Sequence, residues 1–599
     1  MRILDSRRLT GPNLQMPRAG VIAEVAFEEG EAPEAAIAAW WSEVESLATA
    51  LGLALRDLRA RRFSGGASLS FAAPLDVLLA ASDLNDLAIA RASAKLARSE
   101  PVAPQGESIF PATRAVGSDS ESLALLRGMF AAQSNPRLLA LEEEARRRDL
   151  PMLADDTAVT LGMGATSRTY LLPDGSQQGL ALPACNDVPW EKLARIPTAL
   201  ITGTNGKTTS ARLLAHLLAQ SGKRVGLAAT DAVSIAGEVL ERGDFTGPAA
   251  ARLVLRDPRV EVAVLETARG GILRRGLAVE RADCALITNV ADDHLGEYGI
   301  DSVEALARAK AVVAHAVRTD GRIVLNADSR ELVSLWSNSP EVFAAPIIWF
   351  SLDAHGIART LLAAHAANGG EMLLLENGEL IHAIGNVRET IISAKAVPIT
   401  FGGAALYNVA NALAAAGLAL ALGVSLVEIA RGLATFRPDV KDNPGRSNLL
   451  EGPKGVRVLI DFGHNAHGVH QVAGLVAALR GARPGALTTI AGCAGDRSDE
   501  NLRALAQEIA AMQPRRVLLR DLVDYLRGRE PGEVPRKLAQ ELAALSNPAG
   551  DVTIHESETA ALRVALDRAE QNELILVLVH LESEEVGALL AERGFHDAQ

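Results

Sequence analysis

The sequence is poor in the features that mark secreted, membrane-spanning or nucleic-acid-binding proteins. Three cysteines, Cys185, Cys284 and Cys493, lie too far apart for the spacing of a metal site, which favours a reducing compartment. No stretch approaches the roughly eighteen apolar residues of a membrane span, and the chain start has no apolar core of a secretory signal. The formal charge of −13 argues against nonspecific nucleic-acid binding, which needs a basic face. We therefore expect a soluble cytoplasmic protein without membrane or nucleic-acid partners.

Small apolar residues, in contrast, are abundant. Hydrophobic residues make up 48% of the 599 positions but aromatics only 4%, which predicts several cores with close contacts between helices. The length corresponds to about three or four domains. Shifts in composition place an N-terminal domain at 1–160, a connector at 161–196, a central domain at 197–436 and a C-terminal domain at 437–599.

Apolar periodicity predicts an α/β fold. The N-terminal domain mixes strands at 20–27 and 68–71 with helices at 35–51 and 123–148, an α+β pattern, and a loop is expected at 99–118. In the central domain strands alternate with helices, which predicts a doubly wound, mainly parallel sheet; its strands are expected at 199–201, 225–228, 262–265, 284–288 and 323–325. The C-terminal domain repeats the alternation and is expected to be Rossmann-like, with strands at 456–461, 487–491, 517–519, 552–555 and 574–579.

One stretch, residues 197–221, combines a short apolar run, a glycine-bearing turn and an amphipathic helix. Backbone N–H groups of such a turn and helix start bind phosphate, while Lys207 supplies positive charge and the Thr208 hydroxyl is placed to ligate Mg²⁺. Gly203 stands only three residues before Gly206, closer than in the usual Walker A pattern. A chance Gly-Lys-Thr would mean only a turn before a helix. The flanking strand and helix favour a P-loop site for a nucleoside triphosphate.

Polar side chains follow two more predicted strands of the central domain. Glu266 comes directly after one strand, and His294 lies in a polar run, with Asn289, Asp292 and Asp293, after the next. Because ligands collect outside the carboxyl ends of parallel strands, Glu266, His294 and Thr208 are expected to converge on Mg²⁺. Taken singly, Glu266 would be a surface carboxylate and His294 a structural hydrogen-bond partner. Their position beside the phosphate loop favours the metal site.

Other charged residues fall outside this constellation. Lys310, on a helix predicted at 303–317, is by itself expected to be a solvated surface lysine. Arg269 and Arg274 lie in a glycine-bearing loop after Glu266, where guanidinium groups either bind a carboxylate or phosphate or face solvent. Asp461, with His464 close behind it, follows a strand as Glu266 does. No Ser/His/Asp grouping has the context of a hydrolase triad.

The run Thr202-Gly-Thr-Asn-Gly-Lys-Thr-Thr209 resembles the ATP loop of the Mur ligases, the ATP-dependent peptide-bond-forming enzymes of peptidoglycan synthesis. The resemblance continues, in the order of that family, through further motifs: Glu266, Thr288-Asn289…Asp293-His294, Tyr407-Asn408-Val-Ala-Asn411-Ala, Pro444-Gly-Arg446 and Asp461-Phe-Gly-His464-Asn465.

Within the Mur ligases, the sequence is most similar to the Mur-ligase-like half of the cyanophycin synthetases. The shared runs are Gly243-Asp-Phe-Thr-Gly-Pro248, Leu265-Glu-Thr-Ala-Arg-Gly-Gly-Ile-Leu-Arg274, Gly495-Asp-Arg497 and Arg527-Gly-Arg-Glu-Pro-Gly-Glu533. The first residues resemble the start of the N domain of those enzymes. Leu161-Gly-Met-Gly164 resembles the beginning of their aspartate-adding ATP-grasp domain, yet the ATP loop follows too soon for such a domain to fit, so the connector resembles a remnant of it.

The resemblance implies roles for individual residues. Lys207, His294 and Lys310 would be catalytic, Lys310 standing where several Mur ligases carry a carbamylated lysine, and Thr208, Glu266 and His294 would hold Mg²⁺. The implied ATP contacts are Gly203, Thr204, Asn205, Gly206, Lys207, Thr208 and Thr209 at the phosphates, Asn408 and Asn411 at adenine, and Arg446 and Asp461 at phosphate and ribose. The implied substrate contacts are Thr246, Arg269, Arg274, His464, Arg497 and Arg527.

Two positions depart from the family pattern. Tyr407 stands where a histidine is usual, and Phe462-Gly463 replaces Tyr-Ala. Both changes flank residues that are kept, so ATP binding is expected to persist, whereas amino-acid specificity is open.

The leading hypothesis is an ADP-forming ligase that joins an amino acid to a carboxylate through an acyl phosphate, with arginine and the aspartate side chains of a cyanophycin-like acceptor as candidate substrates. The expected partners are an acidic peptide or polymer acceptor, an amino acid, a separate aspartate-adding ligase and further copies of the chain. One alternative is a non-catalytic subunit that binds nucleotide or polymer. Another is a stand-alone peptidoglycan ligase, although residues 1–190 do not resemble a UDP-sugar domain.

Overall fold

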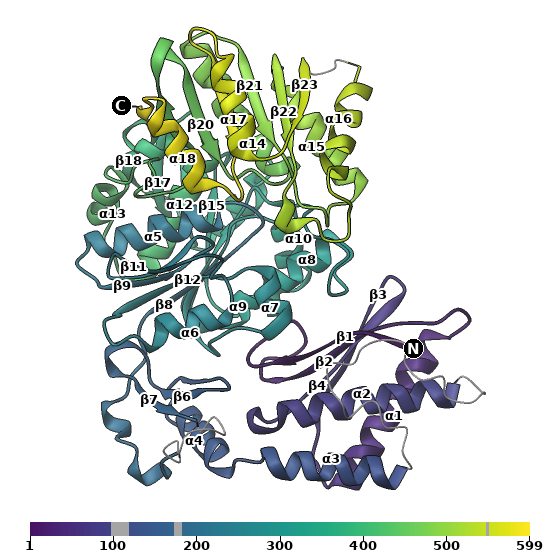
Figure 1. The fold of residues 1–599 in the computed structure, drawn as a ribbon. Helices are drawn as coiled ribbons and strands as arrows, with labels where there is room; N and C mark the ends of the chain where they lie inside the picture. Colours follow the sequence, from purple (N-terminus) through teal and green to yellow (C-terminus); the bar gives the residue numbers. More distant parts are fainter. Residues whose placement is uncertain (97–118, 173–181, 547–549, 599) are drawn as a thin grey trace.

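The computed structural model describes residues 1–96, 119–172, 182–546 and 550–598 (Figure 1). Its strands form a four-stranded N-terminal sheet, a three-stranded connector sheet, an eleven-stranded central sheet and a seven-stranded C-terminal sheet. The α/β fold class is thereby confirmed. The loop expected at 99–118 and residues 173–181 of the connector lie outside the described residues. No helix in the described ranges is long and apolar enough to cross a membrane.

The N-terminal sheet is antiparallel, in the order β1-β2-β4-β3, and its strands are β1 Arg2–Leu9, β2 Gly20–Ala26, β3 Arg56–Phe63 and β4 Gly66–Ala72. Helices α1 (Pro33–Leu51) and α2 (Leu78–Leu96) cover one face. Trp40 is fully buried in this core, whereas Trp41 is 37% exposed. The other face carries polar side chains, because residues alternate across a strand.

The helix predicted over 123–148 is wrong in one respect, because it consists of two helices. They are α3 Asp119–Gln133 and α4 Pro136–Arg147. The Asn135 side chain accepts a hydrogen bond from the Leu138 N–H and caps α4, and Pro136 occupies its first turn. Proline cannot continue a preceding helix but suits the start of a new one.

A small antiparallel sheet bridges the end of the predicted N-terminal domain and the connector; its strands are β5 Met152–Ala154, β6 Ala158–Leu161 and β7 Arg168–Leu171. It is fastened to the central domain by Arg256, at the end of α6 (Pro248–Arg256), which pairs with Asp155 at 2.6 Å and donates to the Thr160 hydroxyl at 2.9 Å.

The central sheet runs β11-β10-β9-β12-β8-β13-β14-β15-β16-β17-β18, and the seven strands from β9 to β16 in this order are parallel. The antiparallel edge strands β10, β11, β17 and β18 extend it. Its strands are β8 Thr198–Thr202, β9 Val225–Ala228, β10 Ala232–Ile235, β11 Glu238–Arg242, β12 Val262–Glu266, β13 Ala282–Ile287, β14 Val317–Asn326, β15 Ile347–Ser351, β16 Glu371–Glu376, β17 Glu379–Ile384 and β18 Val387–Ser393.

Helices cover both faces of this sheet, each over its own apolar core, as a doubly wound fold requires (Figure 1). One face carries α5 Lys207–Gln220, α12 Leu406–Ala421 and α13 Leu426–Leu433; the other carries α6 and the helices α7 Arg269–Arg275, α8 Val303–Lys310, α9 Val312–His315, α10 Arg330–Asn338 and α11 Arg359–Ala367.

The C-terminal sheet has the order β23-β22-β21-β24-β20-β19-β25, with five parallel strands from β23 to β20; β19 pairs antiparallel with β20, and the short β25 pairs antiparallel with β19 at the edge. Its strands are β19 Asn448–Glu451, β20 Arg457–Asp461, β21 Leu487–Ala491, β22 Arg516–Arg520, β23 Asp551–His555, β24 Leu574–Leu578 and β25 His596–Asp597, and its helices are α14 Ala466–Ala482, α15 Asp499–Ala511, α16 Glu533–Ala544, α17 Glu558–Asp567 and α18 Ser583–Glu592. The Rossmann-like expectation is confirmed; the domain boundaries as such stay predictions.

Candidate active site

A cavity of about 590 Å³ lies where the central and C-terminal domains meet. The central domain contributes the loop before α5 and the ends of β9, β13, β14 and β15, and the C-terminal domain contributes the end of β20 and the start of α14. Of the predicted site residues, those that line the cavity are Thr204, Asn205, Gly206, Lys207, Thr208, Thr209, Asn411, Arg446, Asp461 and His464.

The predicted ATP loop connects β8 to α5. Gly206 stands at the N-cap with φ of 85°, and a Cβ there would collide with the Asn411 Oδ1, so only glycine fits. No side chain caps α5, and its first turn carries Lys207 and Thr208 in the cavity wall. The Lys207 Nζ donates to the Thr204 carbonyl at 2.9 Å. An uncapped helix start with a lysine folded over its loop suits a polyphosphate.

Glu266 is the last residue of β12 and only 2% exposed. Its carboxylate accepts from the Thr208 hydroxyl at 3.2 Å, from the Thr230 hydroxyl at 2.7 Å and from the Thr230 N–H at 3.0 Å. A buried carboxylate held mainly by hydroxyls offers oxygen ligands to a hard divalent cation, because the hydroxyls can rotate away. These residues therefore fit one cation beside the phosphate loop.

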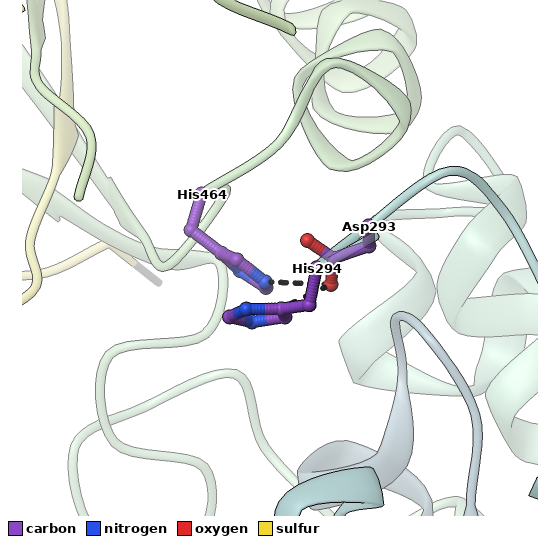
Figure 2. Close-up of side chains that lie close together, drawn as sticks. All are labelled: Asp293, His294 and His464. Atoms are coloured by element: carbon purple, nitrogen blue, oxygen red, sulfur yellow. Dashed lines mark ion pairs between the residues drawn. The ribbon is translucent and has the colours of Figure 1, made fainter. Parts of the chain in front are cut away.

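His294 occupies a different position from the one predicted. Among the described residues neither Thr208 nor Glu266 contacts it; its Nδ1 lies 3.4 Å from Asp496 and its Nε2 3.1 Å from the Arg497 guanidinium, both of the C-terminal domain. Figure 2 shows its ring beside Asp293 and His464, whose ring reaches Asp293 at 3.5 Å. The structure thus joins Thr208 to Glu266 and places His294 in a neighbouring interdomain cluster.

Burial and neighbouring charges act in opposite directions on the pKa values of Asp293 and His294 in this cluster. Burial opposes ionisation of Asp293, but His464, Arg497 and His294 outweigh burial and hold the pKa of Asp293 well below its usual value. Burial lowers the pKa of His294, although Asp496 and Asp293 act in the opposite direction. Asp293, His294 and His464 have ligand atoms close enough to hold a metal ion, yet Arg497 lies 2.8 Å from Asp293 and already compensates its charge.

Lys310 is not the surface lysine that its helix position suggested. It is 5% exposed, and its Nζ donates to the Gly203 carbonyl of the phosphate loop at 2.8 Å. Burial, and next the charge of Lys207, hold the pKa of Lys310 well below its usual value. The expectation failed because a helix in a doubly wound fold buries one face, and Lys310 lies on that face.

The wall of the C-terminal domain carries Arg446 and Asp461. Asp461 ends β20 and accepts from the Ser447 N–H at 2.9 Å, the Ser447 hydroxyl at 3.0 Å and the Gly463 N–H at 3.0 Å. Burial raises the pKa of Asp461, and Arg446 opposes that rise. The Arg446 guanidinium stacks 4.0 Å from the centre of the Phe462 ring.

The two residues that depart from the family pattern both take part in this wall. Phe462 carries Arg446, and the Tyr407 hydroxyl bonds the Ser447 hydroxyl at 2.7 Å, which in turn reaches Asp461. The changes therefore alter how the arginine and the carboxylate are held while keeping both in the cavity wall.

The two predicted adenine contacts behave differently. Asn411 lines the cavity and donates to the Asn408 side chain at 3.1 Å. Asn408 is 1% exposed, lies behind Asn411 and donates to the Ile399 carbonyl at 2.9 Å. Both ends of the Asn408 amide are bound inside the protein, so Asn408 is placed to orient Asn411, and its own contact with adenine stays a prediction.

Five of the six predicted substrate residues lie outside the cavity wall, and four of these, Arg269, Arg274, Arg497 and Arg527, contact the loop that bears His294. His464, which lines the cavity, reaches that loop through Asp293. Arg269 donates to the His294 carbonyl at 2.8 Å and pairs with Glu297; Arg274 donates to the Tyr298 hydroxyl at 2.5 Å. Arg527 pairs with Asp496 at 2.6 Å, and Arg497 pairs with Asp293. Thr246 is 7% exposed and bonds Asp244 of its own loop, while its carbonyl accepts from the Ala268 N–H just before α7.

Sequence reasoning missed Thr230 and, for the predicted ATP contact Asn205, its bonds to the C-terminal domain. Thr230 follows β9 and could have been found by the strand-end argument that found Glu266. Asn205 of the phosphate loop reaches the C-terminal domain, where its amide contacts the Asn465 Oδ1 at 3.2 Å and the His467 Nδ1 at 2.8 Å. No local pattern predicts such a contact between domains.

A phosphate loop before an uncapped helix and a strand-end carboxylate on a doubly wound sheet together define a P-loop nucleotide-binding protein.

Comparison with known proteins gives the family. The Mur ligase middle domain matches residues 201–419, and the Mur ligase, glutamate ligase domain matches residues 445–579, together more than half of the chain. The chain belongs to the Mur ligase family, whose members are ATP-dependent ligases that typically use a divalent metal.

Individual relatives agree with this assignment. The cyanophycin synthetase of Nostoc sp. (strain PCC 7120) is 39% identical over 390 residues, which cover 65% of this chain and 42% of the relative. The chain thus matches less than half the length of that protein. A UDP-N-acetylmuramoyl-L-alanyl-D-glutamate–2,6-diaminopimelate ligase of Alkalilimnicola ehrlichii is 29% identical over 64% of this chain and 71% of the relative. The solved structure of E. coli FolC with DHPP and ADP aligns at a TM-score of 0.49 and 19% identity, over 66% of this chain and 88% of that one, a likeness too distant to bear on function.

Proposed function

We propose that the chain uses Mg²⁺ and ATP to convert a substrate carboxylate into an acyl phosphate, which the amine of an amino acid then attacks to give an amide. The observation that carries the proposal is the cavity itself, in which Lys207 and Thr208 on one wall face Arg446 and Asp461 on the other, with the Glu266 carboxylate hydrogen-bonded to Thr208 behind the first wall. Activation is needed because a free carboxylate is a poor electrophile. The resemblance to the Mur-ligase-like half of the cyanophycin synthetases implies arginine as the amine and the aspartate side chains of an acidic polymer as the acceptor.

The residues of the chain divide the work. The N–H groups at the start of α5 and the ammonium of Lys207 would hold the phosphates, with Arg446 and Asp461 closing over nucleotide from the C-terminal domain. Thr208 and Glu266 would hold Mg²⁺, which supplies charge neutralisation for the transferring phosphoryl group. Lys310 would act from beside the phosphate loop, where its ammonium donates to the Gly203 carbonyl, and its carbamylation stays a prediction. His294 and the arginines around it would orient the acceptor and the amine.

The direct test is product formation. The full chain is incubated with Mg-ATP, an aspartate-ended peptide and each amino acid in turn, and ADP release is measured alongside the product mass. We expect ADP release that requires both an acceptor and one amino acid, with a mass gain equal to that amino acid less water. ADP release that depends on no acceptor–amine pair would contradict the proposal.

A second arm tests whether aspartate addition comes from elsewhere. If the chain works beside an aspartate-adding ligase, it should extend acceptors that already end in aspartate and should not add aspartate itself. No contact in the described residues favours the non-catalytic alternative over the ligase. The cytoplasmic location and the homo-oligomer stay predictions.

A further inference from the structure

The loop that carries His294, residues 293–301, is held in an unusual backbone conformation. His294 and Tyr298 have φ values of 53° and 54°, in the left-handed region that non-glycine residues seldom adopt. The loop's own pairing is limited to one isolated bridge between Glu297 and Ile300. Such a conformation persists only when the surroundings hold it.

Part of that support comes from the N-terminal domain. Across the polar face of its sheet, Arg7 on β1 pairs with Glu24 on β2 at 2.7 Å, Ser68 on β4 donates to Glu24 at 2.8 Å, and Arg61 on β3 donates to Ser68 at 2.9 Å. Arg7, Glu24 and Ser68 are each less than 9% exposed. Four strands thus present one connected polar row, which fixes the direction of Arg61.

Arg61 is the last residue of this polar row, and it contacts the loop that carries His294. Its guanidinium donates to the Gly299 carbonyl at 2.6 Å and to the Tyr298 carbonyl at 3.1 Å. Beside it the Ser64 N–H donates to Asp301 at 2.6 Å, and a Cβ on Gly299 would collide with the Phe63 ring. The end of strand β3 and the loop are therefore in close contact, both through hydrogen bonds and at the Phe63 ring.

The ring of Tyr298 is shared between the domains. The Arg7 guanidinium lies 4.5 Å from its centre, and those of Arg274 and Arg269 lie at 5.6 and 5.9 Å. Arg269 also holds the His294 carbonyl, so the same helix contacts both left-handed residues of the loop. The ring connects the N-terminal sheet to α7.

We propose that Arg61 is a positioning residue for the ligation reaction, acting through the Tyr298 and Gly299 carbonyls to hold the loop that presents Asp293, His294 and Glu297 to the C-terminal domain. The inference rests on the proposed function and adds to it a task for the N-terminal domain. In the described ranges, the hydrogen-bond partners of Arg61 are Ser68, Tyr298 and Gly299, and none of these lines the cavity, so loss of Arg61 should disturb the reaction while leaving nucleotide binding intact.

The experiment compares Arg61→Ala with Arg62→Ala in the full chain. Arg62 is the matched control, because it lies on the opposite face of β3, is exposed and pairs with Glu34. For Arg61→Ala we expect kcat to fall roughly 10²-fold, the loss typical of a misplaced reacting group, with the Kd for ADP changed less than about twofold. Arg61→Lys, which keeps the charge and one donor, should recover part of the loss, and Arg62→Ala should match the wild type.

Hydrogen exchange of residues 293–301 provides a readout independent of turnover. Exchange should be faster in Arg61→Ala and unchanged in Arg62→Ala. Unchanged exchange with unchanged kcat overturns the proposal, and so does a loss in which kcat, ADP affinity and melting temperature fall together, since that marks general destabilisation. If the wild type ligates no acceptor–amine pair, the proposed function fails, and the exchange result alone decides whether Arg61 holds the loop.

Discussion

The two walls of the cavity are built in contrasting ways. On the central-domain side, Lys207 hydrogen-bonds, within the described part of the chain, to a backbone carbonyl of its own loop, and Glu266, behind Thr208 of the wall, is held largely by the hydroxyls of Thr208 and Thr230. On the C-terminal wall, Asp461 is fixed by two backbone N–H groups and a hydroxyl, and Arg446 lies on an aromatic ring.

The contrast shows how a closing site can divide its tasks. Hydroxyls and a lysine can exchange their partners for a phosphate or a cation without leaving buried groups unpaired. Backbone donors cannot turn away, so Asp461 is already oriented before any ligand arrives. The central-domain side is therefore suited to the phosphates and the cation, whose charge changes during the reaction. The C-terminal side is suited to recognising a part of the nucleotide that does not react.

Lys207→Ala should give the largest effect. Removing the cation that meets the transferring phosphate should lower kcat for ADP release by roughly 10³-fold, since one preorganised charge-stabilising group contributes 10²–10³. The exposed Lys223, just beyond α5, supplies the control Lys223→Ala, which should retain wild-type turnover. Equal turnover rates in Lys207→Ala and Lys223→Ala would mean that Lys207 takes no part in the reaction.

Glu266→Gln keeps the shape of the side chain and removes its charge. We expect the Mg²⁺ concentration for half-maximal ADP release to rise about 10- to 100-fold, the loss typical when the surroundings of a metal are altered. Mg²⁺ titrations of this variant and of Glu241→Gln, on the exposed strand β11, measure the difference. A rate lowered equally at all Mg²⁺ concentrations would mean that Glu266 does not bind the ion.

Asp461→Asn sharpens the comparison from the other wall. An amide would turn an N–H toward the donors of Ser447 and Gly463, so we expect the KM for ATP to rise about 10-fold with little change in metal dependence, as a mismatch of 1–3 kcal/mol implies. ATP saturation curves for this variant and for the exposed Asp524→Asn provide the measurement. A shift in Mg²⁺ dependence would instead place the metal on both walls.

Lys310→Met should have the smallest effect of the four substitutions. It should change how the free energy of unfolding depends on pH. Because the folded protein depresses the pKa of Lys310 while the unfolded chain keeps its usual value near 10.5, the wild type gains stability as pH rises between these two values and loses it as pH falls. Relative to Lys310→Met, the free energy of unfolding should therefore increase by up to about 1.4 kcal/mol per pH unit in that window. Urea unfolding at two alkaline pH values checks this, with the exposed Lys395→Met as control; parallel pH dependences would mean that Lys310 is charged in the fold.

Local pattern was enough to find the sheets and the strand-end residues. Glu266 and Asp461 were predicted because parallel strands end at one edge, and both end a strand there. The same reasoning could not tell which face of its helix Lys310 occupies, and it passed over Pro136 within an otherwise helical pattern. The contacts of His294, Asn205 and Arg61 join segments hundreds of residues apart, and no local periodicity encodes them.

The clasp between Asn205 and the C-terminal domain has a thermodynamic consequence. The same loop that is proposed to bind phosphate also bonds Asn465 and His467, so nucleotide occupancy and domain apposition act on one shared group. By thermodynamic reciprocity, if bound nucleotide favours the apposed domains by some factor, apposition of the domains raises the affinity for nucleotide by the same factor. Through Asn205, nucleotide affinity and the equilibrium between the separated and the apposed domains are therefore expected to be coupled.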